Sequence, residues 1–108
     1  MNVLTPGHKY VLANFDNPTA PGQVLQFIQK EPVPADEANT PGQLRLVADG
    51  TTNEEVLAVL IDRLNFLQGK FPCRENAIAL THLETALLWL NKRTADRLAR
   101  GVEGKQLK

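Results

Sequence analysis

The sequence predicts an α+β fold in which a small N-terminal antiparallel β portion precedes a C-terminal antiparallel two-helix hairpin. Two observations support this prediction. Short runs rich in β-branched and aromatic residues occupy the first half of the chain. In the second half, apolar residues recur at spacings of three and four, and one connector interrupts this spacing. We expect the β portion to cover 1–50 and the hairpin, with a short C-terminal tail, to cover 51–108, together forming one compact domain.

Three runs in the first half have the composition of strands. Lys9–Phe15 and Gln23–Lys30 are separated by a turn that is rich in Asp, Asn, Pro and Gly, and Gln43–Asp49 alternates between two faces. Between the last two runs, residues 31–42 contain three prolines and read as a surface loop. We therefore expect one three-stranded sheet, which needs another layer or subunit to cover its apolar face.

The first helix should begin near Asn53. Thr52 can cap it, and Glu55 can reach back to the Thr52 amide as in a capping box. Gly69 should end this helix, because glycine enters the left-handed region readily and Pro72 cannot continue a helix. The apolar stripe of the first helix consists of Val56, Leu57, Leu60, Ile61, Leu64 and Leu67.

The second helix should begin near Arg74 and end before Gly101. A connector this short makes the two helices antiparallel. The expected stripe of the second helix consists of Ile78, Ala79, Leu83, Ala86, Leu87 and Leu90. Leu88 and Trp89 widen it beyond what one partner helix can cover. This excess either packs against the N-terminal half or forms an oligomer interface, and we favour the oligomer.

The totals limit the classes of function. A chain of 108 residues is too small for a roomy enclosed active site, although a site shared between subunits would not need one. Twelve basic and twelve acidic residues cancel, which argues against binding of a nucleic acid polymer. The single cysteine, Cys73, excludes an internal disulfide and fits a reducing compartment. Neither a secretion signal nor a membrane span is evident, so we expect a cytoplasmic protein.

A few side chains have the chemistry of a phosphate and base site. Arg93 and Arg97 lie four residues apart and offer two planar forks to a diphosphate, although both could simply be solvated charges near the end of a helix. Phe66 reads either as core or as a stacking platform, and Asn76 either bonds local backbone or meets the edge of a purine. No catalytic group and no metal-ligand spacing is recognisable, so neither an enzyme nor a cofactor is expected.

The segment from Asp49 to Gly104 resembles the helical-hairpin domain of small phage-encoded sponges that bind immune signals. The motifs TTNEEV, FPCREN and WLNKRTADR with the ending GVEG carry the resemblance. The family includes anti-CBASS cyclic-nucleotide sponges and Thoeris anti-defence sponges, and the β portion of this chain is similar to that of the Thoeris type. The tail departs from the family, because Lys105 and Gln106 follow Gly104 where a threonine and a polar residue are common.

The resemblance implies a non-catalytic protein that assembles, often as a hexamer, and sequesters a nucleotide messenger of bacterial immunity in the infected host. For the Thoeris type the messenger is a cyclic ADP-ribose isomer, and some members also hold cyclic di- or trinucleotides. The family's adenine-stacking aromatic matches Phe66, and its asparagine matches Asn76. Its phosphate-gripping arginines match Arg93 and Arg97, and Arg45 matches a further basic contact.

Helix geometry adds a constraint to this interpretation. Asn76 and Arg97 are about 30 Å apart along one helix, too far for one small ligand, so the site would have to join two subunits. One alternative function is a structural or regulatory hairpin that binds a protein partner through Leu88 and Trp89. Another is an enzyme that hydrolyses the messenger, which would release a chemically changed ligand.

Overall fold

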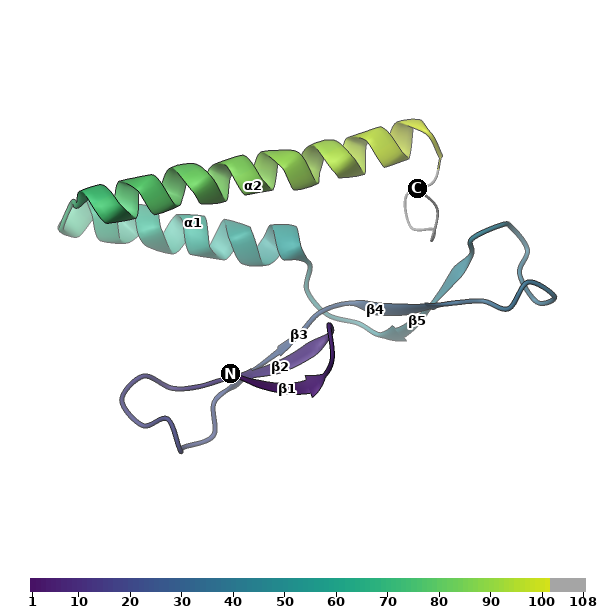
Figure 1. Cartoon of the computed structure of the whole chain (residues 1–108), viewed down its shortest axis with the longest axis horizontal. Coiled ribbons are helices and arrows are strands. Elements are labelled where there is room, and N and C mark those ends of the chain that lie inside the picture. The colour runs from purple at the N-terminus through teal and green to yellow at the C-terminus, as the bar shows by residue number, and fades with distance from the viewer. Residues whose placement is uncertain (102–108) are drawn as a thin grey trace. The chain divides into compact units, whose positions relative to one another are not determined.

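The computed structural model describes residues 1–101, which form five strands followed by two helices (Figure 1). The chain divides into two compact units, of which the first is Met1–Thr52 and the second begins at Asn53. The predicted fold class is confirmed, since antiparallel strands precede a two-helix hairpin. The tail expected after Gly101, including Lys105 and Gln106, lies outside the described residues.

The first unit holds two small antiparallel sheets instead of the single sheet that we expected. One sheet has the order β1-β2-β3 and the other pairs β4 with β5. The strands are β1 (Asn2–Thr5), β2 (Lys9–Leu12), β3 (Gln23–Gln26), β4 (Gln29–Pro32) and β5 (Leu44–Ala48). The sequence did not predict β1, and it assigned the end of β4 to a loop.

The predicted strand Gln23–Lys30 is wrong as a single element because the backbone changes partners in its middle. The Phe27 amide donates to the His8 carbonyl at 2.7 Å, whereas the Ile28 amide donates to the Thr51 carbonyl at 2.9 Å. The residues before this point pair with β2 and those after it pair with β5. A continuous β-rich run therefore serves two sheets.

Backbone contacts and one aromatic pair tie this junction together. The Thr51 amide donates to the Gln26 carbonyl at 2.9 Å, and a Cβ on Gly50 would lie 2.3 Å from that carbonyl oxygen. Only glycine therefore lets the chain pass so close. Nearby, the rings of Tyr10 and Phe27 meet edge to face with their centroids 6.0 Å apart.

The second unit is the hairpin of α1 (Asn53–Lys70) and α2 (Arg74–Ala99). Both starts agree with the prediction. The predicted stop at Gly69 is wrong, because α1 continues through it to Lys70 and the glycines with positive φ are elsewhere in residues 1–101. At the end of α2, Gly101 does adopt the left-handed conformation, with a φ of 72°, as expected of a glycine after a helix.

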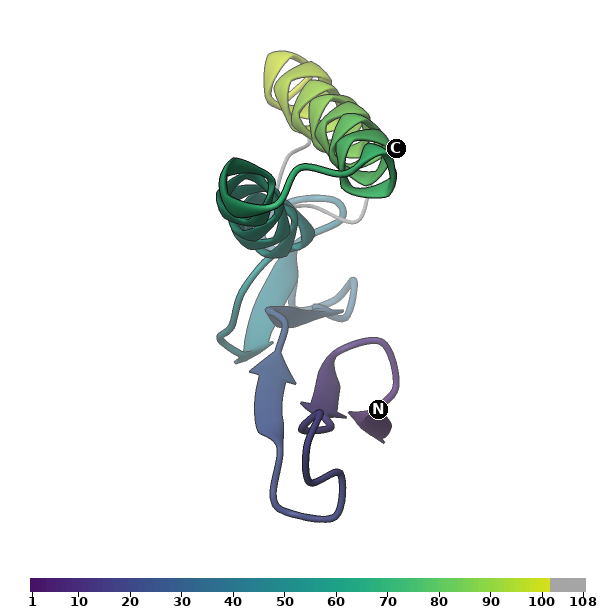
Figure 2. The ribbon, with the colours of Figure 1, turned by 90° about the vertical axis from the view of Figure 1, so that its left-hand side faces the viewer.

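Gln68 closes the connector between the helices, which Figure 2 shows from its own side. Its side-chain amide donates to the Cys73 carbonyl at 3.0 Å, and its side-chain oxygen accepts from the Cys73 amide at 2.8 Å. Cys73 in turn caps α2, since its thiol accepts from the backbone amide of Asn76 at 3.4 Å. A three-residue connector is thus held in place by one side chain.

The buried face of α2 follows a regular spacing of four and three. Among the described residues, Leu80 is the hydrophobic side chain that is buried, with 7% of its surface exposed. The stripe predicted from the sequence did not include Leu80. Ile78 and Ala79, which we had placed on the stripe, are exposed. The positions that do form this face are Asn76, Leu80, Leu83, Leu87, Leu90, Thr94 and Arg97. The same face is therefore apolar in its middle and polar at both ends.

The two helices differ in length, because α1 has 18 residues and α2 has 26. In an antiparallel pair with so short a connector, the last two turns of α2 extend about 12 Å beyond the start of α1. Figure 1 shows this projecting end of α2 in yellow-green. The residues on it have no α1 surface opposite them.

Candidate functional site

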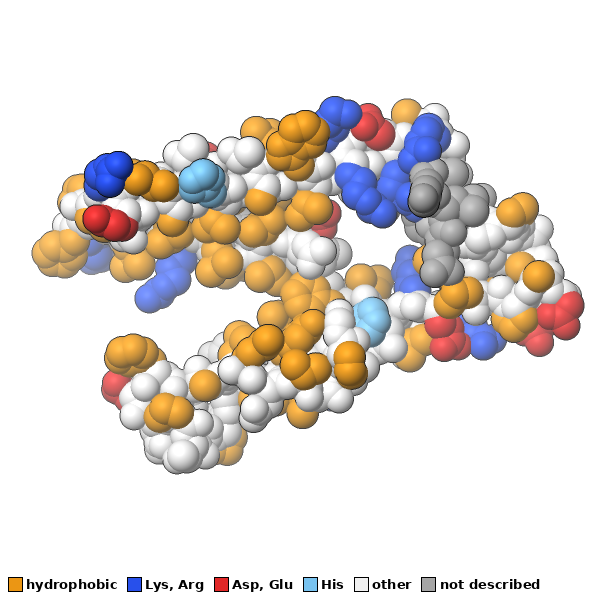
Figure 3. Space-filling view, in the orientation of Figure 1, with side chains coloured by type: hydrophobic (Ala, Val, Ile, Leu, Met, Phe, Trp, Pro, Cys, Tyr) orange, Lys and Arg blue, Asp and Glu red, His pale blue; other side chains and the backbone are white. Residues whose placement is uncertain are grey.

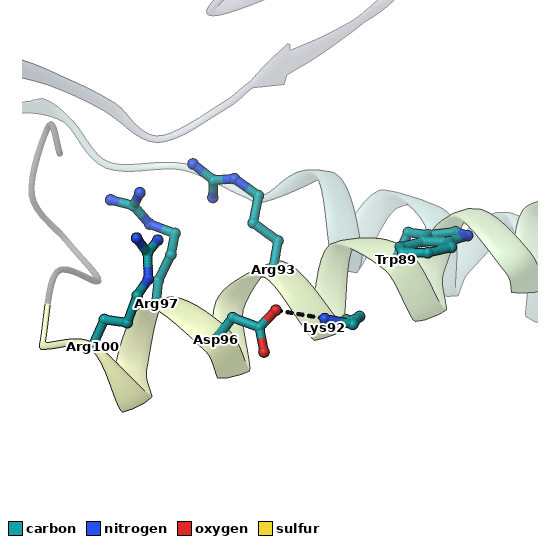
Figure 4. Close-up of a pocket in the computed structure, with 6 residues that line it drawn as sticks. All are labelled: Trp89, Lys92, Arg93, Asp96, Arg97 and Arg100. Carbon is teal, nitrogen blue, oxygen red and sulfur yellow. Dashed lines mark hydrogen bonds and ion pairs between the residues drawn. The ribbon is translucent and has the colours of Figure 1, made fainter. Parts of the chain in front are cut away.

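Basic side chains surround a hollow at the projecting end of α2. Its lining residues are Trp89, Lys92, Arg93, Asp96, Arg97 and Arg100, and its volume is about 420 Å³ (Figure 4). Lys92 pairs with Asp96 at 2.6 Å, so these two charges offset each other. The lining holds four basic side chains and one acidic side chain, so its formal charge is positive. We call Arg93, Arg97 and Arg100 the basic end of the hairpin.

The three arginines project from the same side of α2, as Figure 4 shows. Their spacings of four and three residues explain this, since residues so spaced share a helix face. The carbonyl end of the helix also favours positive charge. In the space-filling view of Figure 3, Lys and Arg side chains gather over this part of α2. The arrangement offers several forked donors to one anion.

Arg97 differs from its neighbours in being buried, with only 6% of its surface exposed. It continues the inner face of α2 that begins with Asn76 and Leu80. The interpretation of Arg97 as a solvated surface charge is therefore wrong. Burial restricts the rotamers of a long side chain, so the direction of this guanidinium is set by the fold.

The other end of the hairpin, next to the connector, carries aromatic and amide groups. Phe66 is 61% exposed, so the interpretation of Phe66 as core of this chain is wrong. The ammonium of Lys70 lies 5.1 Å from the centroid of the Phe66 ring. Asn76 is half-buried in the first turn of α2. We call Phe66, Gly69, Lys70 and Asn76 the turn end of the hairpin.

Arg45 lies in the β unit, on β5, and forms an ion pair with Glu31 on the neighbouring strand. The distance from Arg45 Nε to Glu31 Oε1 is 2.7 Å, and both side chains are about half exposed, at 54% and 49%. Exposed pairs of this kind are weak, so an anionic ligand could compete with Glu31 for the guanidinium.

The structure brings the candidate residues together in two groups. Arg93 and Arg97 share the basic end, and Phe66 and Asn76 share the turn end. The two groups are far apart, because the 21 residues from Asn76 to Arg97 span about 30 Å of helix. No small ligand can touch both ends of one hairpin.

Sequence reasoning missed several residues of these two ends. Arg100 continues the spacing of Arg93 and Arg97, and that spacing was the signal that could have found it. Lys70 lies four residues after Phe66, a spacing at which helix side chains meet. Trp89, expected to be core or interface, is 66% exposed beside the hollow.

Other kinds of site find little support in the part of the chain that the structure describes. Within residues 1–101, no three His, Cys, Asp or Glu side chains lie close enough together to hold a metal ion. Neither described helix combines the length and the apolar character that crossing a bilayer requires. Cys73 is exposed and unbridged.

Comparison with known proteins agrees with the hairpin geometry. Residues 28–95 match the family model described as the Acb2/Tad1 hairpin domain, a range that contains all of β4, β5 and α1 and most of α2. A segment of 58 residues is 59% identical to Thoeris anti-defense 1 of Bacillus phage SBSphiJ7. That segment is 53% of this chain and 41% of the relative, so the chain spans well under half of the relative's length. The chain belongs to the Acb2/Tad1 hairpin-domain family.

Proposed function

We propose that this protein binds and sequesters a nucleotide second messenger of bacterial antiphage immunity without cleaving it. The messenger is a cyclic ADP-ribose isomer, and binding extends to cyclic di- and trinucleotides. Sequestration takes place in the cytoplasm of the infected host. The name of the phage relative, Thoeris anti-defense 1, supports an anti-defence role. The observation that carries the proposal is the basic end, where three guanidinium groups project from one helix face around a hollow.

Each end of the hairpin supplies one part of the chemistry. Arg93 and Arg97 would hold the two phosphates through charge-assisted, bidentate hydrogen bonds. Phe66, exposed at the turn end, would stack on the adenine ring. Asn76 would fix the orientation of the base through its side-chain amide. A cyclic ADP-ribose isomer carries both an adenine and a diphosphate, so it needs both ends.

A site of this kind requires two copies of the chain. The ends of one hairpin are about 30 Å apart, so the turn end of one copy must meet the basic end of another. Such head-to-tail contacts close into rings when the rotation between copies fits, and we propose a homohexamer. The exposed Leu88 (69%) and Trp89 (66%) on α2 would supply apolar contact area between copies.

Filtration tests the proposal directly. The purified protein is mixed with cyclic ADP-ribose isomers and a panel of cyclic di- and trinucleotides, the protein is filtered out, and it is then denatured. A messenger that disappears from the filtrate and returns intact after denaturation identifies a sponge and its ligand. A sponge must bind well below signalling concentrations, so we expect a Kd in the nanomolar range, about −12 kcal/mol. A chemically changed ligand would indicate an enzyme instead.

Mixing two binding-deficient variants tests whether the site is shared. Chains carrying Phe66→Ala and chains carrying Arg97→Ala are unfolded together, refolded as a mixture and titrated with the ligand. If each site takes its turn end and its basic end from different copies, random assembly restores both wild-type ends in about a quarter of the sites. A mixture that binds no better than the two variants alone would place the site within one chain.

A protein partner is the second candidate function, and the exposure of Leu88 and Trp89 is the observation that favours it. Under that function the filtrate would retain every nucleotide. Substitution of Trp89 by Ser would then abolish capture of one dominant host protein. For a sponge, the same substitution would weaken assembly of the chain with itself.

A further inference from the structure

No contact or backbone conformation within the described chain explains why α1 has a glycine at position 69. Glycine makes a helix less stable than alanine does, and the φ of Gly69 is not positive. A Cβ added at this position would meet no atom within 4 Å. Neither backbone conformation nor packing within the described chain therefore requires glycine there.

The residues next to Gly69 indicate what kind of group could occupy the open space beside it. Phe66 lies three residues earlier, so its exposed ring and Gly69 share one helix face. Lys70 places its ammonium 5.1 Å from the centroid of the same ring. The ring thus has a cation over it, and the helix face that it shares with Gly69 carries no side chain at that position. A flat group could lie on the Phe66 ring and over the Gly69 backbone without meeting a side chain.

We infer that Gly69 and Lys70 complete the base-binding surface around Phe66, an inference that rests on the proposed function. The adenine stacks on the Phe66 face left open by Lys70 and extends over the backbone of Gly69. Lys70 holds the ring in position through its contact with the opposite face. Its positive charge would also attract an anionic nucleotide bound on this ring. Lys70 is therefore a positioning residue for the ring and a secondary contact for the anion.

The variant Gly69→Ala separates this role from a structural one. A methyl group in a helix stabilises the folded chain, so the melting temperature should stay the same or rise by a few degrees. At the same time the methyl group would occupy the space of the base. We expect the Kd for a cyclic ADP-ribose isomer to rise about fivefold or more. A stability change and an affinity change of opposite sign are not expected from a helix residue that only supports the fold.

Lys70 is tested with a conservative and a non-conservative variant. Lys70→Met keeps the aliphatic stem and removes the charge, and it should raise the Kd by about two- to fivefold. Lys70→Arg keeps a cation over the ring and should restore wild-type affinity. Lys30→Met, on β4 in the other unit, is the matched control for Lys70→Met and should leave the Kd unchanged.

The outcomes are distinct from those of the proposed function. If the wild-type protein retains no nucleotide, the proposed function itself is wrong. If the wild type binds and Gly69→Ala binds equally well, Gly69 has no part in the site. A change in oligomer mass of Gly69→Ala, measured by light scattering, would instead assign the open space to a contact between copies and overturn the inference. Weaker binding with unchanged mass and undiminished stability supports it.

Discussion

The two ends of the hairpin belong to the same pair of helices but differ in charge, in exposure and in what supports them. At the turn end, α1 and α2 face each other, the Gln68 side chain closes the connector, and the groups on offer are a ring and an amide. At the basic end, α2 extends beyond α1 and carries guanidinium groups, of which that of Arg97 is buried. The difference teaches that the two ends of one small hairpin can present different chemistry, and under the proposed function each end supplies one half of a site shared between two copies.

Removing the charge of the basic end should have the largest effect on binding. Hydrogen bonds to charged groups contribute about 1.5–3 kcal/mol each, so Arg97→Ala should weaken binding at least about tenfold. The double variant Arg93→Ala/Arg97→Ala should weaken it at least about a hundredfold. Titration calorimetry with a cyclic ADP-ribose isomer measures both. Arg63→Ala, an exposed arginine of α1 outside the hollow, is the matched control. Unchanged affinity in the double variant would remove the phosphate assignment.

Truncating the ring of the turn end should have the next largest effect. Stacking of a base on an aromatic side chain contributes about 1–3 kcal/mol, so Phe66→Ala should weaken binding about tenfold. The oligomer mass and the melting temperature should not change, because Phe66 is exposed. Phe15→Ala, at a 98% exposed position of the β unit, is the control. If the Phe66→Ala protein failed to fold, Phe66 would have to be interpreted as a core residue.

Asn76 should contribute less energy and more selectivity. A neutral hydrogen bond contributes about 0.5–1.5 kcal/mol, so Asn76→Ala should weaken binding of the adenine ligand about fivefold. An analogue with hypoxanthine in place of adenine should bind the wild type more weakly, and the variant should bind the two ligands alike. Asn91→Ala, an exposed position on the same helix, should preserve the discrimination. Equal loss of both ligands in Asn76→Ala would show that Asn76 supports the helix start only.

The connector should matter for stability more than for charge recognition. Gln68→Ala removes two hydrogen bonds to the Cys73 backbone and should lower the free energy of unfolding by about 1 kcal/mol. Thermal unfolding followed by circular dichroism measures this loss. Gln23→Ala, at an exposed position of β3, is the control. Binding of the ligand should weaken in Gln68→Ala with an unchanged dependence on salt, because the basic end is intact. A reduced salt dependence would show that the two ends are not independent.

Arg45 should have the smallest effect. Its guanidinium is already paired with Glu31, so a ligand gains little by replacing one anion with another. We expect Arg45→Ala to raise the Kd about twofold. Glu31→Gln should lower the Kd slightly by freeing the guanidinium. A tenfold loss of affinity in Arg45→Ala would instead show that Arg45 binds a phosphate of the ligand.

Much of the hairpin could be predicted from the sequence because its signals are local. The starts of both helices and the end before Gly101 follow from spacing and glycine chemistry. Gly69 misled the prediction, since the same freedom that lets glycine end a helix does not oblige it to do so. The choice of Ile78 over Leu80 was an error of phase, and a strict spacing of four and three from Asn76 to Arg97 would have corrected it.

The β unit was harder to predict because its strands are defined by partners far away in the sequence. Nothing in the run Gln23–Lys30 reveals that Phe27 bonds to His8 while Ile28 bonds to Thr51. For the candidate site, spacing placed Arg93 and Arg97 on one face, and the resemblance supplied the roles of Phe66 and Asn76. Exposure could not be read from the sequence, because aromatic rings occur both in cores and on surfaces, and because the burial of Arg97 departs from the usual exposure of arginine.

The unequal length of the two helices has a kinetic consequence. A messenger already in the cell is also bound by the effector it activates, so a sponge gains from capturing it quickly as well as tightly. The last turns of α2 present their arginines beyond the start of α1, where positive potential extends into the solvent. We expect the association rate constant, measured by stopped flow, to fall as salt is added while the dissociation rate constant changes much less. The projecting end of α2 would thus set the rate at which the messenger is captured.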